Sequence, residues 1–159
     1  MEHSIHQFSL EGIGGERIEF ASFKGKKLIV VNVASACGYT PQYQQLQELY
    51  EKFEDKLVIV GIPCNDFGGQ EPGDNQQIKT FCSTRYGVSF PMAAKISIKG
   101  PDAHPLYQWL GSKALNGKMD TQVRWNFHKY LLDEKGVLVQ SLPSAVEPFD
   151  EVILNWLQP

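Results

Sequence analysis

Residues 28–53 read LIVVNVASACGYTPQYQQLQELYEKF, and this stretch decides the fold. Its first part, residues 28–33, is an apolar, β-branched run that predicts a strand buried on both faces of a sheet. Thr40 and Pro41 then predict the start of a helix, as a capping residue followed by proline at the first helical position. The apolar residues that follow recur at helical spacing: Tyr43, Leu46, Leu49, Tyr50 and Phe53. The stretch therefore predicts a buried strand followed by an amphipathic helix.

A second strand and helix follow this first pair. Residues 57–62 form another continuous apolar run, which predicts a parallel neighbour of the first strand. A Gly- and Pro-rich loop over residues 64–73 leads to Asp74, which can cap a helix together with Gln77 three residues later. Gly87 is placed to end that helix.

The remaining elements complete the arrangement of an α/β protein. The sequence predicts short strands at 7–10 and 17–20, a strand near 92–98, a helix from His104 and Pro105, a hairpin of strands 127–132 and 137–142, and a final helix from Pro148. A βαβ unit followed by a ββα unit on one sheet is the thioredoxin-fold arrangement. We therefore expect a thioredoxin fold with an N-terminal β-hairpin and a middle insertion, formed as a single domain by residues 1–159.

Composition and charge exclude several classes of function. The chain has 159 residues, of which 42% are apolar and 21% charged, with a net charge of −3. This balance argues against a nucleic-acid partner, because such proteins usually carry a basic excess on one face. No apolar stretch approaches the roughly 18 residues of a membrane span. No secretory signal is recognisable either, so we expect a cytoplasmic protein.

The chain contains three cysteines, Cys37, Cys64 and Cys82. An odd number without a close pair is not typical of a disulfide framework or of a structural zinc site, and no cofactor or metal is expected. Two possibilities remain. Either all three cysteines are buried spectators, or the chain uses one or two thiols for chemistry.

Cys37 lies between the first buried strand and the helix that follows it. Unpaired backbone N–H groups and the helix dipole favour an anion at such a place, and hence a nucleophilic thiolate. The alternative is a small apolar residue that closes the strand. Thr40 stands where a disulfide oxidoreductase carries its second cysteine, which argues against dithiol exchange or isomerase activity. A lone activated thiol suits attack on the oxygen of a peroxide.

Four segments of the chain resemble the glutathione peroxidase family. They are NVASACGYT at 32–40, PCNDFGGQEP at 63–72, YGVSFP at 86–91 and RWNF at 124–127. They occur in the family's order and extend over almost the whole chain. The chain is most similar to the cysteine-containing, non-selenium members with two redox cysteines.

The resemblance implies a set of site residues. Cys37 corresponds to the peroxidatic residue, and Gln70, Trp125 and Asn126 correspond to the rest of the family's catalytic tetrad. These three side chains are neutral hydrogen-bond donors, which can stabilise a thiolate and then the leaving group without a fixed cation. Cys82 corresponds to the resolving cysteine.

The resemblance also implies a cycle. Cys37 attacks hydrogen peroxide or an organic hydroperoxide, lipid hydroperoxides included, and becomes a sulfenic acid, and Cys82 then forms an intramolecular disulfide with it. The expected reductant is thioredoxin rather than glutathione, and the chain is expected to be a monomer. Because Cys82 lies on the apolar face of its helix, that helix must unwind for the two thiols to meet. An alternative is a peroxide sensor or redox relay, in which Cys37 passes its oxidation to a partner protein.

Three other residues need separate interpretation. Cys64 follows the second buried strand and is interpreted as a packing residue. Asp66 stands where the family often has an amide, and adds a negative charge near the expected thiolate. His128 stands where the family often has a small hydroxyl residue, and its alternation with core positions indicates a structural role.

Overall fold

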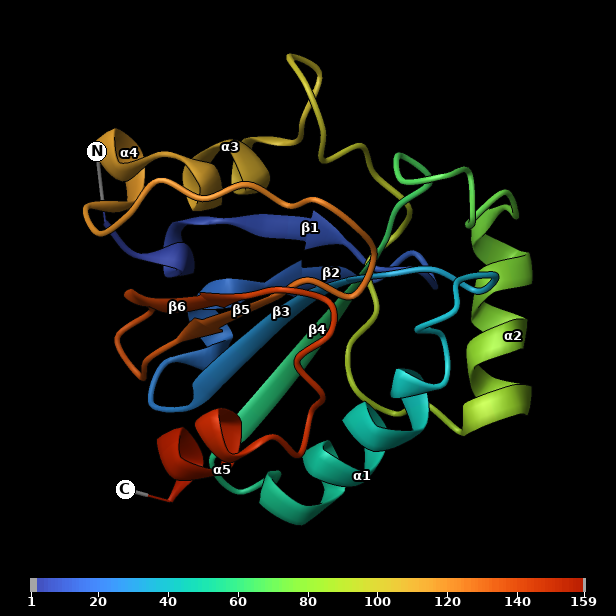
Figure 1. Cartoon of the computed structure of the whole chain (residues 1–159), viewed down its shortest axis with the longest axis horizontal. Coiled ribbons are helices and arrows are strands. Elements are labelled where there is room, and N and C mark those ends of the chain that lie inside the picture. The colour runs from blue at the N-terminus through green and yellow to red at the C-terminus, as the bar shows by residue number, and fades with distance from the viewer. Residues whose placement is uncertain (1–2, 159) are drawn as a thin grey trace.

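A four-stranded mixed sheet forms the centre of the fold (Figure 1). The computed structural model describes residues 3–158. Its strands are β1 (Ser9–Glu11), β2 (Arg17–Glu19), β3 (Lys27–Val33), β4 (Leu57–Pro63), β5 (Lys129–Leu132) and β6 (Leu138–Leu142), and its α-helices are α1 (Gln42–Phe53), α2 (Asn75–Tyr86), α3 (Pro105–Gly111), α4 (Lys113–Asn116) and α5 (Glu151–Leu157). Two short 3₁₀ helices cover Ile5–Gln7 and Phe20–Phe23.

The strand order confirms the predicted thioredoxin-fold topology. The central sheet has the order β4-β3-β5-β6, in which β3 is parallel to β4 and antiparallel to β5, and β6 is antiparallel to β5. β1 and β2 form the expected N-terminal hairpin as a separate two-stranded sheet. The middle insertion lies between α2 and β5 and contains α3 and α4.

Strand β3 divides the apolar core into two layers. Ile29 and Val31 pack with α1, α2 and α5, whereas Leu28 and Val30 pack with α3 and the N-terminal hairpin. This alternation follows from the two-residue period of a strand, whose successive side chains point to opposite faces. The helices therefore cover both faces of the sheet, which explains the nearly continuous apolar run (Figure 1).

The two main helices differ in how they start. α2 has the predicted capping box between Asp74 and Gln77, and Gly87 ends it with a φ of 58°. The prediction for α1 was wrong in detail, because Pro41 is the residue that precedes its first turn and no side chain caps it. Thr40 is unavailable as a cap because its hydroxyl is bonded back into the preceding loop.

Three other predicted boundaries need correction. Residues 92–98 form no regular strand, since Met92 and Ala93 make only isolated bridges to β4 and to Gly12. The strand predicted at 127–132 begins only at Lys129, because Phe127 has a φ of 65° that a strand cannot accommodate. The last helix begins at Glu151, where Asp150 provides the cap, rather than at Pro148.

Within residues 3–158, none of the helices is both long and apolar enough to cross a bilayer.

Candidate active site

Cys37 lies in the loop that joins β3 to α1, and hydrogen bonds fix this loop. The Cys37 N–H donates to the Thr40 hydroxyl oxygen at 2.8 Å, and that hydroxyl donates to the Ala34 carbonyl at 2.8 Å. The Tyr39 N–H donates to the Cys37 sulfur at 3.3 Å. Cys37 is 7% exposed, and its sulfur accepts this backbone hydrogen bond ahead of α1, an arrangement that suits a thiolate.

Gln70 and Asn126 come from distant parts of the chain and are hydrogen-bonded to each other. The Asn126 side-chain NH₂ donates to the Gln70 side-chain oxygen at 3.1 Å and to the Phe67 carbonyl at 3.2 Å. Both of its hydrogens are thus engaged, so Asn126 orients Gln70. The NH₂ group of Gln70 makes no hydrogen bond to another described residue, which leaves it available to a substrate or a sulfur.

A backbone hydrogen bond joins this pair to the cysteine loop. The N–H of Ala36, the residue before Cys37, donates to the Gln70 carbonyl at 3.0 Å. The end of β3, the loop after β4 and the segment before β5 therefore meet at one place. Of the four predicted tetrad residues, these bonds bring Cys37, Gln70 and Asn126 into one neighbourhood.

Trp125 is the fourth predicted residue, and 36% of it is exposed. Its ring lies edge-on to Phe67, with ring centroids 6.3 Å apart, and packs closely over Gly68. A Cβ atom on Gly68 would lie 2.7 Å from the indole ring, and the φ of 70° at this residue also favours glycine. The sequence GG at 68–69 thus allows the indole to lie on the loop that carries Gln70.

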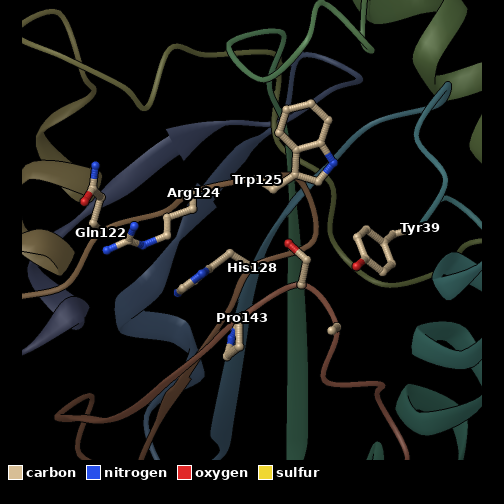
Figure 2. A pocket seen from close by; sticks show the side chains of 8 residues that line it. Tyr39, Gln122, Arg124, Trp125, His128 and Pro143 are labelled. Carbon is tan, nitrogen blue, oxygen red and sulfur yellow. The ribbon is translucent and has the colours of Figure 1, made fainter.

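A surface cavity of about 340 Å³ opens beside Trp125. Figure 2 shows Arg124 and Gln122 at its left, Tyr39 at its right, and Trp125 and His128 between them. Its remaining wall is Pro143, Ser144 and Ala145. The cavity thus offers an aromatic and aliphatic surface with one guanidinium at its edge.

A buried asparagine in β3 supports the segment that carries Trp125 and Asn126. The Asn32 side chain donates to the Trp125 carbonyl at 3.1 Å and accepts from the His128 N–H at 3.1 Å. The Ser144 hydroxyl donates to the Asn126 carbonyl. These bonds span the residue with positive φ, Phe127, and explain why one amide interrupts the apolar run of β3.

Asp66 and His128, the two residues that differ from the family pattern, are both hydrogen-bonded within the fold. The Asp66 carboxylate accepts hydrogen bonds from the N–H groups of Ile98 and Lys99, and so ties the loop after β4 to the irregular segment between α2 and α3. The His128 ring is hydrogen-bonded to the Ser141 hydroxyl at 2.7 Å, and burial lowers its pKa to about 4. His128 also borders the cavity beside Trp125, a position that its alternation in the sequence did not reveal.

The other two thiols lie on opposite faces of the sheet. Cys82 packs in the same apolar layer as Cys37, on the face of the sheet that α1 and α2 cover. Cys64 packs in the other apolar layer, on the face that α3 covers. Burial raises the pKa of Cys64 to about 12 and that of Cys82 to about 11. All three cysteines are free.

Glu71 is a residue of this site to which the sequence assigned no role. It follows Gln70, is fully buried, and accepts a hydrogen bond from the Ser35 hydroxyl. Burial raises the pKa of its carboxyl, whereas the Ser35 hydrogen bonds and the charge of Lys95 act in the opposite direction. Only its place between Gln70 and Pro72 could have drawn attention to it, since glutamates in loops are mostly exposed.

Comparison with known proteins agrees with this geometry. The family model for glutathione peroxidase matches residues 5–111. Hydroperoxy fatty acid reductase gpx1 of Synechocystis sp. is 44% identical, over 94% of this chain and 92% of its own length. Glutathione peroxidase-like peroxiredoxin 2 of Saccharomyces cerevisiae is also 44% identical, over 93% and 92%. The crystal structure of T. cruzi GPX1 matches with a TM-score of 0.72 at 30% identity, over 97% of this chain and 96% of that one.

The matched residues include the loop of Cys37, the loop of Gln70 and Glu71, and α2 with Cys82. The relatives extend the similarity to more than nine-tenths of the chain. The chain therefore belongs to the glutathione peroxidase family, and it is a thiol peroxidase.

Proposed function

We propose that residues 1–159 form one peroxidase domain in which Cys37 attacks the peroxide and Gln70, Trp125 and Asn126 assist it. The observation that carries this assignment is the set of hydrogen bonds from Ala36 to Gln70 and from Asn126 to Gln70. They bring the side chains of Gln70 and Asn126 to the loop of Cys37, whose sulfur accepts a hydrogen bond from the Tyr39 N–H in the turn ahead of α1.

The first chemical step is the transfer of one oxygen to sulfur. The Cys37 thiolate attacks the terminal oxygen of the hydroperoxide, the O–O bond breaks, and the sulfur is oxidised to a sulfenic acid. The leaving oxygen departs as an alkoxide or hydroxide and takes up a proton to give alcohol or water. The free NH₂ of Gln70, oriented by Asn126, and the indole N–H of Trp125 are the neutral donors for the charge that develops on this oxygen.

The second step joins Cys37 to Cys82, and α2 must move for this to occur. The helix buries only Ile78 and Cys82, which supports its local unwinding. Both thiols pack in one apolar layer, which favours Cys82 over Cys64 as the resolving cysteine.

The substrate range includes hydrogen peroxide and organic hydroperoxides. The open cavity beside Trp125 can hold an apolar chain against Tyr39 and Pro143. The Synechocystis relative is named as a reductase of hydroperoxy fatty acids, which supports lipid hydroperoxides as substrates of this chain. Arg124 at the edge of the cavity suits the carboxylate of such a substrate.

We assign reduction of the disulfide to thioredoxin rather than glutathione. The yeast relative is named as a peroxiredoxin, and a disulfide within one chain suits a dithiol reductant. We further propose that the protein acts as a monomer in the cytoplasm, where its three free thiols remain reduced between cycles.

Peroxide-dependent NADPH oxidation tests the proposal. The assay is coupled through thioredoxin and its reductase, or through glutathione and its reductase, for the wild type, Cys37→Ser, Cys82→Ser and Cys64→Ser. We expect Cys37→Ser to be inactive with both reductants, Cys82→Ser to lose the thioredoxin-dependent rate, and Cys64→Ser to retain it. A wild-type rate for Cys82→Ser would contradict the two-cysteine cycle. Accumulation of a mixed disulfide with a partner, in place of the Cys37–Cys82 disulfide, would favour the relay.

A further inference from the structure

Lys129 is a charged residue that the fold buries completely and that the cycle described so far does not use. It is the first residue of β5, where it pairs with Val31 of β3 and Leu142 of β6. Within residues 3–158 its amine forms no ion pair. Lysines are almost never fully buried unless they are paired, so other contacts must hold this amine.

Two backbone carbonyls take the place of a carboxylate partner. The Lys129 Nζ donates to the Phe127 carbonyl at 2.7 Å and to the Ser144 carbonyl at 3.3 Å. Burial lowers the pKa of this amine to about 7, and the charge of Glu147 acts in the opposite direction. Because an ammonium carries three N–H groups and a neutral amine two, either form can hold both carbonyls.

The Phe127 carbonyl belongs to a strained residue directly after Asn126. Phe127 is the one non-glycine residue with a positive φ in the described part of the chain, at 65°. Such a conformation is unfavourable for a bulky side chain and persists only where neighbouring groups hold it. The Phe127 N–H donates to the Asn32 carbonyl at 2.6 Å, and Lys129 holds the Phe127 carbonyl. The peptide groups on both sides of Phe127 are thus fixed.

Ser144 joins Lys129 to Asn126 by a second route. The Ser144 hydroxyl donates to the backbone carbonyl of Asn126 at 2.5 Å. The carbonyl of Ser144 accepts from Lys129 and also, at 2.9 Å, from the Gln42 side chain of α1. Ser144 lines the cavity beside Trp125 as well. Lys129 therefore ties the backbone of Asn126 to the wall of that cavity.

The orientation of the Asn126 side chain depends on this backbone. Its NH₂ group donates to Gln70 and to the Phe67 carbonyl, but its oxygen has no hydrogen-bond partner among the described residues. If Phe127 relaxed to a negative φ, the Asn126 side chain would turn with the backbone. The NH₂ group of Gln70 would then lose its orientation.

We propose that Lys129 is a positioning residue for the attack on the peroxide: its amine holds the carbonyls of Phe127 and Ser144 and thereby keeps Asn126 against Gln70. No bond forms or breaks at Lys129 itself. The event that depends on it is the departure of the alkoxide or hydroxide, whose charge the oriented NH₂ of Gln70 stabilises. This inference rests on the proposed roles of Gln70 and Asn126.

Two reactions of Cys37 separate this role from general stability. The rate with hydrogen peroxide depends on the oriented amides, whereas the rate with iodoacetamide needs an accessible thiolate but no donor for a leaving oxygen. Both are measured on the full chain at pH 7 as loss of the free Cys37 thiol, by rapid mixing and mass spectrometry. For Lys129→Met, which has a similar size and no donor, we expect a peroxide rate at least tenfold lower and an alkylation rate within threefold of the wild type.

Three other variants sharpen the comparison. Lys129→Arg keeps buried donors and should retain at least a third of the peroxide rate. Lys129→Gln is polar but too short to reach both carbonyls, so it should behave as Lys129→Met and takes its place if the methionine variant does not fold. Gln42→Leu is the matched control, because it removes a buried donor to Ser144 but leaves Phe127 held. It should stay within twofold in both reactions. Circular dichroism and the melting temperature report whether each variant is folded.

A double-mutant cycle tests whether Lys129 acts through Asn126. Asn126→Ala alone should lower the peroxide rate at least tenfold. Addition of Lys129→Met should then lower it by no more than a further twofold, because the side chain that Lys129 positions is already absent. Losses that multiply would show that Lys129 acts by another route and would overturn the proposal.

The single variants can overturn it as well. A fold-only role of Lys129 would change the peroxide and alkylation rates of Lys129→Met by one factor. A peroxide rate near that of the wild type in Lys129→Met or Lys129→Gln, or an equal loss in Gln42→Leu, would also contradict the positioning role. A wild-type peroxide rate in Asn126→Ala would instead refute the proposed tetrad, and this variant is measured before the others.

Discussion

Helix α1 follows Cys37 and helix α2 carries Cys82, the two thiols of the proposed cycle, and both helices have 12 residues, yet the fold anchors them very differently. α1 buries Gln42, Tyr43, Leu46, Gln47, Leu49 and Phe53 against the sheet. α2 buries only Ile78 and Cys82, and its other side chains are exposed or half-buried. The helix that follows Cys37 is thus part of the core, whereas the helix that carries Cys82 lies at its margin (Figure 1).

The difference suits the different requirements of the two thiols in the proposed cycle. The peroxidatic loop needs fixed geometry, which α1 and β3 provide. The resolving thiol needs freedom to travel, and a helix that buries two side chains can detach at a cost of a few kcal/mol. The capping box and Gly87 stabilise α2 locally, and in the proposed cycle they keep it folded while Cys37 is reduced.

Disulfide formation should affect the two helices very differently. In the Cys37–Cys82 disulfide form, we expect amides of α2 to exchange with deuterium at least about a thousandfold faster than in the reduced form, because the helix must unwind. Amides of α1 should keep their protection. Hydrogen exchange with mass spectrometry measures both segments in one sample. Unchanged protection in α2 would show that Cys82 is not the resolving cysteine.

Truncation of one buried side chain in each helix separates an effect on the stability of the whole fold from an effect on the rate of disulfide formation. Leu46→Ala in α1 should lower the free energy of unfolding by about 3 kcal/mol and leave the disulfide step within twofold. Ile78→Ala in α2 should also destabilise the fold, but it should speed disulfide formation because it weakens only the closed helix. Urea unfolding and rapid-mixing kinetics give the two quantities. Equal effects of both variants on the disulfide step would remove the distinction.

The rates at which Cys82 and Cys64 react with an alkylating reagent compare how readily α2 and the end of β4 open. In the reduced Cys37→Ser variant, iodoacetamide should label Cys82 at least about tenfold faster than Cys64, because Cys64 becomes accessible only when the end of β4 opens. Thiolate increases with pH, so the Cys82 rate should rise and then level off near pH 9, where a thiol in an opened helix is ionised. A rate that still rises toward pH 11 would indicate reaction inside the folded helix, whose burial raises the pKa to about 11.

Substitution of the helix caps should give the smallest effect on the rate of disulfide formation. Asp74→Ala removes the capping box of α2, which should cost about 1 kcal/mol and speed disulfide formation about fivefold. Asp150→Ala removes the cap of α5 at a similar cost, and is the matched control, since α5 carries neither thiol of the proposed cycle. Both are compared by thermal melting and by the disulfide rate. An equal acceleration in Asp150→Ala would mean that general stability, and not α2, controls the step.

Local signals in the sequence were sufficient for much of this structure. The apolar runs predicted β3 and β4, and the Asp74 and Gln77 spacing predicted the start of α2. These features depend on neighbours within a few residues, where period and capping chemistry act. The segments 92–98 and 127–128 were mispredicted because long-range packing, not local propensity, sets their backbone.

By itself, then, the sequence determined the fold class, the family and the four tetrad candidates, because residue order and short motifs carry that information. Only the tertiary structure decided that Asn126 orients Gln70, that Cys82 shares a layer with Cys37 while Cys64 does not, and that Glu71 is fully buried against Ser35. These are relations between residues far apart in the chain. Whether a glutamate is solvated or sealed from water depends on which elements close over it, and that is settled only when the sheet and its helices pack together.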